Sequence, residues 1–273
     1  FPSRQALIPQ LVGRANISAA VAFNATTFQV GTFLGPLFAG TVIIGFGGGA
    51  AVLVYAASTL WMVIMISQIN IPRLSRNEET DSGLFTDIGD GFRYIAHNKS
   101  LRILFLLMFT TGILYRPVAE LMPAFADKIF DRGVGGLTVL NAAAGFGSLT
   151  AAAVLAYRGR TQGLVYVMLV GSILGSIFLI VFTQIDVFVI ALISLALSAM
   201  GYLSSQVGVQ SLVQNIAVPA MRGRVIAVHS AIAAGSPAIG AVAIGALADV
   251  VGLQPAVAVA GAASVPSIIV AST

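Results

Sequence analysis

Residues 15–71 of the chain read ANISAAVAFNATTFQVGTFLGPLFAGTVIIGFGGGAAVLVYAASTLWMVIMISQINI, without a single charged side chain. A helix that crosses a bilayer needs about 20 mainly apolar residues, so this stretch is long enough for two helices and a turn. The glycine-rich segment GFGGG, residues 45–49, marks the turn, because glycine clusters interrupt helices. The stretch therefore predicts a helical hairpin within a membrane.

Similar apolar stretches fill most of the remaining chain. Together with the hairpin they give eight predicted spans, at residues 17–45, 50–70, 101–125, 134–157, 163–184, 187–210, 225–248 and 252–272. The composition agrees, since 9% of the residues are charged and a soluble domain has about 25%. The sequence therefore predicts an all-α, multi-pass membrane protein.

Lys and Arg side chains gather on one side of these spans. Two of them, Lys128 and Arg132, fall on the opposite side, against eleven on the first. Short cytoplasmic loops are enriched in Lys and Arg, so the eleven mark the cytoplasmic side, where Phe1 and Thr273 are also expected. We expect a cell membrane, the inner or plasma membrane of a bacterium. The eleven are Arg4, Arg14, Arg73, Arg76, Arg93, Lys99, Arg102, Arg158, Arg160, Arg222 and Arg224.

The one long loop, residues 72–100, is predicted on the same side. Its second half has apolar side chains at helical spacing and charged side chains opposite them, which is typical of an amphipathic helix on a membrane surface. The apolar set is Leu84, Phe85, Ile88, Phe92 and Ile95, and the charged set is Asp87, Asp90 and Arg93.

Two parts of the chain match without a gap at an offset of 205 residues, which aligns Gln5 with Gln210. The aligned stretches are QALI (5–8) with QSLV (210–213), and Gly31, Gly35 and Gly40 with Ser236, Gly240 and Gly245. Six predicted spans separate the two copies, which indicates a parallel repeat of six helices, one arrangement by which transporters build two halves around a midplane site. A chance match between glycine-rich helices is the alternative. If the repeat is real, four helices precede Phe1.

Residues 31–40, GTFLGPLFAG, resemble the fifth-helix antiporter motif of the major facilitator superfamily, G-x-x-x-G-P-x-x-G-G, with Ala39 in place of one glycine. Four other stretches are similar to the branch that holds enterobactin exporters and macrolide-efflux proteins. They are RQALIP (4–9), DIGDGFRYI (87–95), LMPAFA (121–126) and MRGRV (221–225). One departure is that Tyr157-Arg158-Gly159-Arg160 keeps the basic part of a gating-loop signature without its preceding Asp.

This resemblance implies a twelve-helix bundle of which the chain holds helices five to twelve. Residues 1–71 would end the N-terminal lobe, residues 72–100 would link the lobes, and residues 101–273 would form the C-terminal six-helix lobe. The four N-terminal helices of the same protein would then be a partner that this chain needs.

Arg116 and Glu120 are the sharpest candidates for a functional site. They lie four residues apart in the outer half of the 101–125 span, so they can pair on one helix face. A charged group at the centre of a membrane helix costs about 2.5–3.5 kcal/mol, and such groups usually face a cavity and carry function. The alternative is a structural ion pair close to the interface. Pro117 and Pro123 are expected to bend the helix.

The 187–210 span has a polar stripe at four-residue spacing. A stripe of this kind faces a translocation path or hydrogen-bonds to another helix. The resemblance makes this helix ten, which lines the cavity, so Tyr202 and Gln206 are the strongest pathway candidates and Ser198 is a third. The whole stripe is Ser194, Ser198, Tyr202, Gln206 and Gln210. Weaker candidates are Asn24, Gln29, Asn141 and His229, for which helix packing or an interfacial role is the alternative.

The other candidates are mechanical. Small residues and a proline are expected to allow helix packing and hinge motion, namely Gly31, Gly35, Pro36, Gly40, Gly240 and Gly245. The cytoplasmic gating loops would use Arg158, Arg160, Arg222 and Arg224.

The chain has no cysteine, no cluster of metal ligands, no nucleophile–base pair and no P-loop. We therefore expect neither an enzyme nor a cofactor, a metal or a nucleic-acid partner. We expect a secondary transporter, a proton antiporter that exports an amphipathic small molecule such as a siderophore, a macrolide-like drug or a metabolite. The alternatives are an importer or lipid-flipping transporter of the same fold, and a non-transporting membrane scaffold or sensor.

Overall fold

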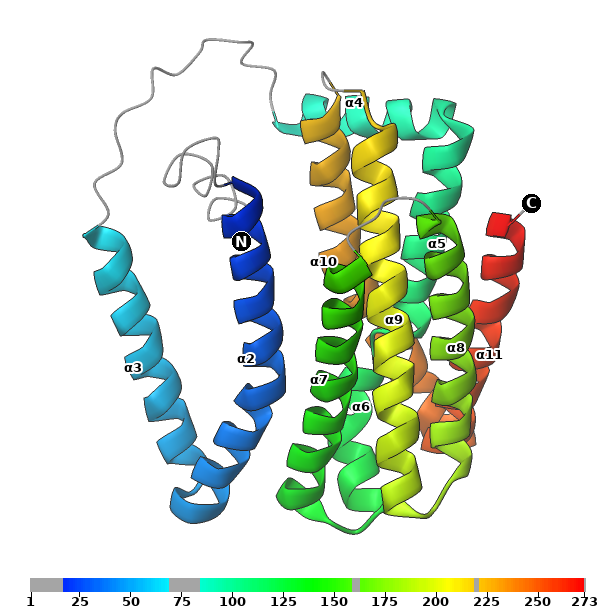
Figure 1. Cartoon of the computed structure of the whole chain (residues 1–273). Helices are drawn as coiled ribbons and strands as arrows, with labels where there is room; N and C mark the ends of the chain where they lie inside the picture. Colours follow the sequence, from blue (N-terminus) through cyan, green and yellow to red (C-terminus); the bar gives the residue numbers. More distant parts are fainter. Residues whose placement is uncertain (1–16, 69–83, 159–162, 219–220, 273) are drawn as a thin grey trace. The chain divides into compact units, whose positions relative to one another are not determined.

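The computed structural model describes residues 17–68, 84–158, 163–218 and 221–272, and its regular structure is helical throughout these ranges (Figure 1). The predicted all-α fold is thereby confirmed for this part of the chain. The chain divides into two compact units, Phe1–Asp81 and Ser82–Thr273.

The first unit is a hairpin of two helices, α2 (Ile17–Phe46) and α3 (Gly48–Ser67). Gly47 alone connects them, and its φ of 82° is a conformation that glycine adopts at little cost. Its N–H donates to the Ile43 carbonyl at 2.9 Å and closes α2. The turn predicted at residues 45–49 is thus confirmed.

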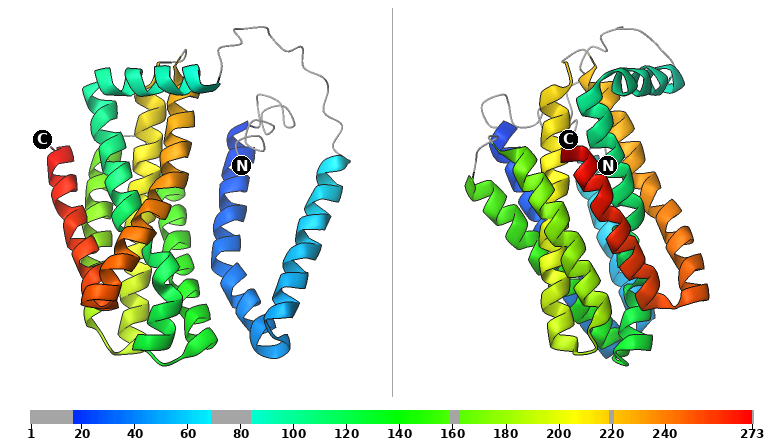
Figure 2. Two further views of the ribbon diagram at one scale, coloured as in Figure 1. Left: turned by 180° about the vertical axis from the view of Figure 1, so that it is seen from behind. Right: turned by 90° about the vertical axis from the view of Figure 1, so that its right-hand side faces the viewer.

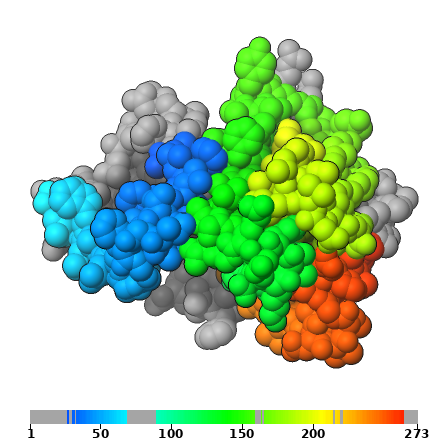
Figure 3. Space-filling view, turned by 90° about the horizontal axis from the view of Figure 1, so that it is seen from below, coloured from blue at the N-terminus to red at the C-terminus, as the bar shows by residue number. Residues whose placement is uncertain are grey.

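The second unit is a bundle in which α5 to α11 run roughly along one direction and α4 lies across one end (Figure 2). Within the bundle, α9 packs against α7 and α8, α8 packs against α11, and α10 packs against α5 and α11. Figure 3 views the opposite end, where the turns after η2, α8 and α10 lie. The elements are α4 (Leu84–His97), α5 (Lys99–Leu114), α6 (Val118–Ala124), the π-helix η2 (Phe125–Ile129), α7 (Gly133–Arg158), α8 (Leu164–Gln184), α9 (Phe188–Ile216), α10 (Arg222–Val251) and α11 (Leu253–Ser272).

Six helices of the described residues are long and apolar enough to cross a membrane. They are Gly48–Ser67, Lys99–Ile129, Gly133–Arg158, Val165–Gln184, Phe188–Val213 and Arg222–Val251. The other two predicted spans, 17–45 and 252–272, coincide with α2 and α11, of which the shorter segments Phe33–Phe46 and Leu253–Ala263 are apolar helices in the searched part. The multi-pass architecture is confirmed, and the count of eight stays a prediction.

The buried side chains of the second unit form two apolar clusters with a polar layer between them. The first cluster lies near α4 and includes Leu101, Phe105, Met168, Val213 and Val225. The second lies toward the other end and includes Val118, Phe125, Leu179, Leu195 and Val257. The intervening turns of α5, α8 and α9 bury hydroxyl groups instead, at Thr111, Ser172, Ser176, Ser198 and Ser205. The polar layer is therefore at the middle of the bundle.

Glycines permit close helix contacts in the second unit. A Cβ on Gly240 of α10 would collide with the Ile113 carbonyl of α5 and would lie 2.6 Å from the Pro117 ring. Where α8 crosses α9, a Cβ on Gly171 would lie 2.7 Å from the carbonyl oxygen of Gly201. Helices in lipid associate through such close packing, so these crossings stabilise the bundle.

We predict that Gly240→Ala destabilises the protein by about 1–3 kcal/mol, because the added methyl group forces α10 away from α5. The matched control on the same helix is Gly245→Ala, since no atom lies within 4 Å of a Cβ at Gly245. The melting temperature of each variant is measured on a fluorescent-protein fusion by size-exclusion chromatography after heating. Equal melting temperatures of the two variants would contradict the packing described for Gly240.

Candidate functional site

The span that begins with α5 is broken near its middle. Pro117 has no N–H, so the Ile113 carbonyl loses its usual helical partner, and α5 ends at Leu114 while α6 starts at Val118. The Arg116 N–H reaches back to the Thr111 carbonyl at 3.4 Å, five residues away. The predicted span at 101–125 lies within the apolar helical stretch Lys99–Ile129, and the bend expected at Pro117 is a break between α5 and α6.

The break separates Arg116 from Glu120. The four-residue spacing pairs side chains only on a continuous helix, and within the described part of the chain these two form no ion pair. Both side chains are exposed. The positive charge of Arg116 acts instead on Tyr202, whose ring stacks on that of Tyr115, the neighbour of Arg116 in the chain. Arg116 therefore lies near Tyr202 of α9 and is not paired with Glu120.

Two tyrosines stack at this level. The rings of Tyr115 and Tyr202 are 4.2 Å apart between centroids and nearly parallel, with 6° between their planes. The Tyr202 hydroxyl accepts a hydrogen bond from Nε2 of Gln206 at 2.8 Å. The stack joins the end of α5 to α9 and places two predicted pathway residues, Tyr202 and Gln206, beside each other.

Ser198 connects three helices. Its Oγ donates to the Gly175 carbonyl of α8 at 2.8 Å and lies 2.7 Å from the Tyr115 hydroxyl. A serine hydroxyl has one proton, so Tyr115 is the donor in the second bond. Ser198 is fully buried, which makes it a structural link between α5, α8 and α9.

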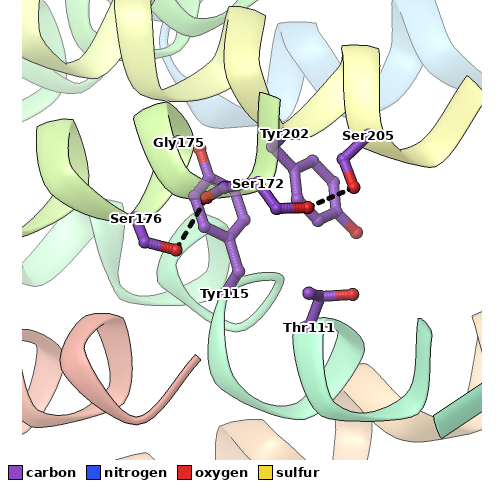
Figure 4. A pocket seen from close by; sticks show the side chains of 7 residues that line it. All are labelled: Thr111, Tyr115, Ser172, Gly175, Ser176, Tyr202 and Ser205. Atoms are coloured by element: carbon purple, nitrogen blue, oxygen red, sulfur yellow. Dashed lines mark hydrogen bonds between the residues drawn. The ribbon is translucent and has the colours of Figure 1, made fainter. Parts of the chain in front are cut away.

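A second hydroxyl pair lies next to the tyrosines. Ser172 and Ser205 are 2.5 Å apart between their Oγ atoms, and the Ser176 hydroxyl donates to the Ser172 carbonyl at 2.9 Å. Between these groups is a small cavity of about 10 Å³, roughly the space of one water molecule. Figure 4 shows its lining, which is Thr111, Tyr115, Ser172, Gly175, Ser176, Tyr202 and Ser205.

The sequence did not single out Tyr115, Thr111, Ser172, Ser176 or Ser205. A signal existed, because Thr111 and Tyr115 are four residues apart on α5 and Ser172 and Ser176 are four residues apart on α8. Only the stripe on α9 was interpreted as a polar face. Three stripes with the same spacing would have predicted one shared layer.

The other predicted residues lie outside this layer. Asn141 is half-buried on α7 and makes none of the hydrogen bonds of the layer. His229 on α10 packs edge-on against Phe105, with ring centroids 6.3 Å apart. On α9, Ser194 is buried and Gln210 is exposed. The side chains of Asn24 and Gln29 lie outside the described residues.

The predicted hinge residues differ in their packing. Of the six, Gly240 is in tight contact, whereas a Cβ at Gly31, Gly35 or Gly245 would meet no atom of the described structure within 4 Å. Gly40 is buried, and Pro36 lies inside α2. Their role as a hinge stays a prediction.

A protein family described as transmembrane secretion effector, MFS_3, matches residues 1–273, the whole chain. The chain belongs to this family. Membership makes it a major-facilitator-type membrane transporter rather than an enzyme, which confirms the superfamily resemblance. The enterobactin and macrolide branch and the missing N-terminal helices stay predictions. Among curated proteins, none matches the chain.

In this transmembrane secretion effector, α4 is docked on the end of the bundle. Asp90 of α4 forms an ion pair with Arg224 of α10 at 3.3 Å. The Val218 N–H donates to the Tyr94 hydroxyl at 3.4 Å, and Ile95 is buried in the first apolar cluster. The amphipathic helix predicted here is confirmed, and it packs partly on protein. Of the other predicted gating arginines, Arg158 and Arg222 are exposed and Arg160 lies outside the described residues.

We predict that Arg224→Gln loosens α4 and speeds amide hydrogen exchange in residues 84–97 by up to about fivefold. The Asp90 and Arg224 side chains are 44% and 32% exposed, so their ion pair contributes at most about 1 kcal/mol. The exposed neighbour gives the control, Arg222→Gln. Restoration by the swapped pair Asp90→Arg/Arg224→Asp would support the assignment, and equal exchange in the two single variants would contradict it.

We also predict that Ser198→Ala destabilises the transporter by about 1–2 kcal/mol, because the Tyr115 hydroxyl and the Gly175 carbonyl lose their partner. Adding Tyr115→Phe removes one unpaired group, so the double variant should be less destabilised than the sum of the single variants. The melting temperatures of the wild type, the two single variants and the double variant, each as a fluorescent-protein fusion, complete this double-mutant cycle. Strict additivity would argue against the Tyr115–Ser198 bond.

Proposed function

We propose that this transmembrane secretion effector is a secondary transporter that exports an amphipathic small molecule by alternating access, driven by proton entry. The observation that carries the proposal is Arg116, an exposed charged side chain well inside the Lys99–Ile129 membrane span. An arginine in contact with hydrocarbon at that depth costs about 2.5–3.5 kcal/mol or more, so such residues face water-filled cavities or protein.

The groups around Arg116 suit passage of an amphipathic molecule. The Tyr115 and Tyr202 rings offer an apolar, aromatic surface, and Gln206 and Arg116 offer polar contacts at the same level. Transporter sites near the midplane are typically built where membrane helices are interrupted, as the span is at residues 115–117. We therefore assign the edge of this layer, at Arg116, Tyr202 and Gln206, as the part of the substrate path that the second unit contributes.

The test of export uses everted membrane vesicles from cells that produce the full-length protein. Uptake of a panel of fluorescent amphipathic dyes is followed with and without a protonophore. Uptake that collapses with the protonophore supports proton-driven export. Uptake only in right-side-out vesicles would indicate an importer, and a lipid analogue that is moved while dyes are not would indicate lipid flipping. No movement of any probe, together with no thermal shift by any of them, would favour the scaffold alternative and refute the proposal.

Glu120 is our candidate for the proton site, because it lies inside the Lys99–Ile129 span, whereas the other described carboxylates lie in α4 or close to the ends of the spans. These are Asp90, Asp127, Asp131, Asp186 and Asp249. A carboxylate couples transport to protons only if it binds and releases one in each cycle. We predict that Glu120→Gln lowers concentrative uptake more than tenfold and leaves downhill exchange of the same dye intact. Protonophore-sensitive uptake at the wild-type rate would exclude Glu120 from the coupling.

A further inference from the structure

The polar groups around Arg116 have N–H and O–H groups that are not all used in hydrogen bonds within the protein. The Tyr202 oxygen accepts from Gln206, so its own O–H proton is not used in that bond and can be donated to a ligand. Gln206 uses one N–H of its amide on Tyr202 and keeps a second. A guanidinium has five N–H groups and accepts none. The accessible groups of this cluster are thus mainly donors.

The charge of the cluster is positive. Arg116 forms no ion pair with any carboxylate of the described residues, and Glu120 lies beyond the helix break. Arg116 is also the charged group that acts on Tyr202 in the described structure. A ligand that contacts Tyr202 and Gln206 would therefore meet a positive charge and several donors.

The hydroxyl groups deeper in the layer have a different role. Ser198 is fully buried and bonded to Tyr115 and Gly175, and Ser172 is bonded to Ser205. The cavity among them has room for about one water molecule, which excludes a substrate. Recognition is thus left to the exposed edge of the layer, at Arg116.

We infer that Arg116, Tyr202 and Gln206 form a subsite for an anionic head group of the substrate, a carboxylate, sulfonate or phosphate. Guanidinium groups bind these anions with two parallel hydrogen bonds. The Tyr115–Tyr202 stack would contact the aromatic or apolar part of the same molecule. The inference rests on the proposed transport function and specifies its substrate as an amphipathic anion.

The experiment uses three fluorescent probes that share one ring system and differ in charge. They are dansylglycine, which is anionic, dansylamide, which is neutral, and dansylcadaverine, which is cationic. Binding to the full-length protein in phosphatidylcholine nanodiscs is measured by the rise in dansyl fluorescence, with empty nanodiscs subtracted. We expect the anionic probe to bind tightest. Arg116→Gln should weaken its binding about tenfold or more, as expected for the loss of a charge-assisted hydrogen bond, and leave the neutral probe within twofold.

Three variants separate charge from fold. Arg116→Lys should retain part of the preference for the anionic probe. Tyr202→Phe should weaken binding of the anionic probe, whereas binding of dansylamide should persist because the aromatic ring is retained. Lys128→Gln removes an exposed cation of η2 and should change nothing. Unaltered dansylamide binding shows that each variant is folded. Equal or tighter binding of the neutral or cationic probe, a loss common to all three probes, or no binding of any probe would overturn the inference.

Two further arms settle the source of the anion and the link to transport. Nanodiscs that contain phosphatidylglycerol should compete with dansylglycine if the natural anion is a lipid head group, and should not compete if it is a soluble molecule. Uptake of the same probes into everted vesicles tests transport separately. Uptake of the neutral or cationic probe alone would refute the anion subsite but still support the transport proposal. Anion-selective binding without uptake of any probe would support the subsite and refute the transport proposal.

Discussion

The hydrocarbon core of a bilayer has no water to pair with polar groups, and this constraint determines the middle of the second unit. The Tyr115 hydroxyl donates to Ser198, and Ser198 donates to the Gly175 carbonyl, so the chain of bonds ends within the protein. The bonds join α5, α8 and α9, and they fix the heights of these helices relative to one another. Two apolar clusters above and below the layer leave no alternative partners, which makes this register specific.

The broken span and the glycine contact depend on one another. Pro117 removes the N–H that the Ile113 carbonyl would receive in a helix, and α10 approaches that carbonyl closely through Gly240, which has no side chain to obstruct it. The same interruption leaves Arg116 without an ion pair to Glu120, and the charge of Arg116 acts on Tyr202. The break at Pro117 thus determines that Arg116, without a paired carboxylate, gives the site its positive charge.

Apolar runs without charges predicted where the helices lie, because the length of a span is a property of the local sequence. The turn at Gly47 and the amphipathic helix α4 were predictable for the same reason. The proximity of Arg116 to Tyr202 was not, since it depends on how the Tyr115–Pro117 segment departs from helical geometry. The roles of Ser172 and Ser205 could not be assigned from single helices, because a serine in one membrane span gives no indication of its partner in another.

A polar layer that stabilises a bundle and one that recognises a substrate make opposite demands on the same groups. A buried hydroxyl that already donates one hydrogen bond and accepts another, as Ser198 does, has no proton left to offer a ligand. A group that keeps unused donors at an exposed position can discriminate strongly, because a ligand without the matching acceptor leaves those donors desolvated and unpaired. Tyr202 combines both roles, because its ring stacks on Tyr115 while its hydroxyl accepts from Gln206 and is influenced by the charge of Arg116. Its ring belongs to the fixed part of the layer and its hydroxyl to the part that can select, so a change of substrate preference should arise at the edge of the layer without repacking its interior.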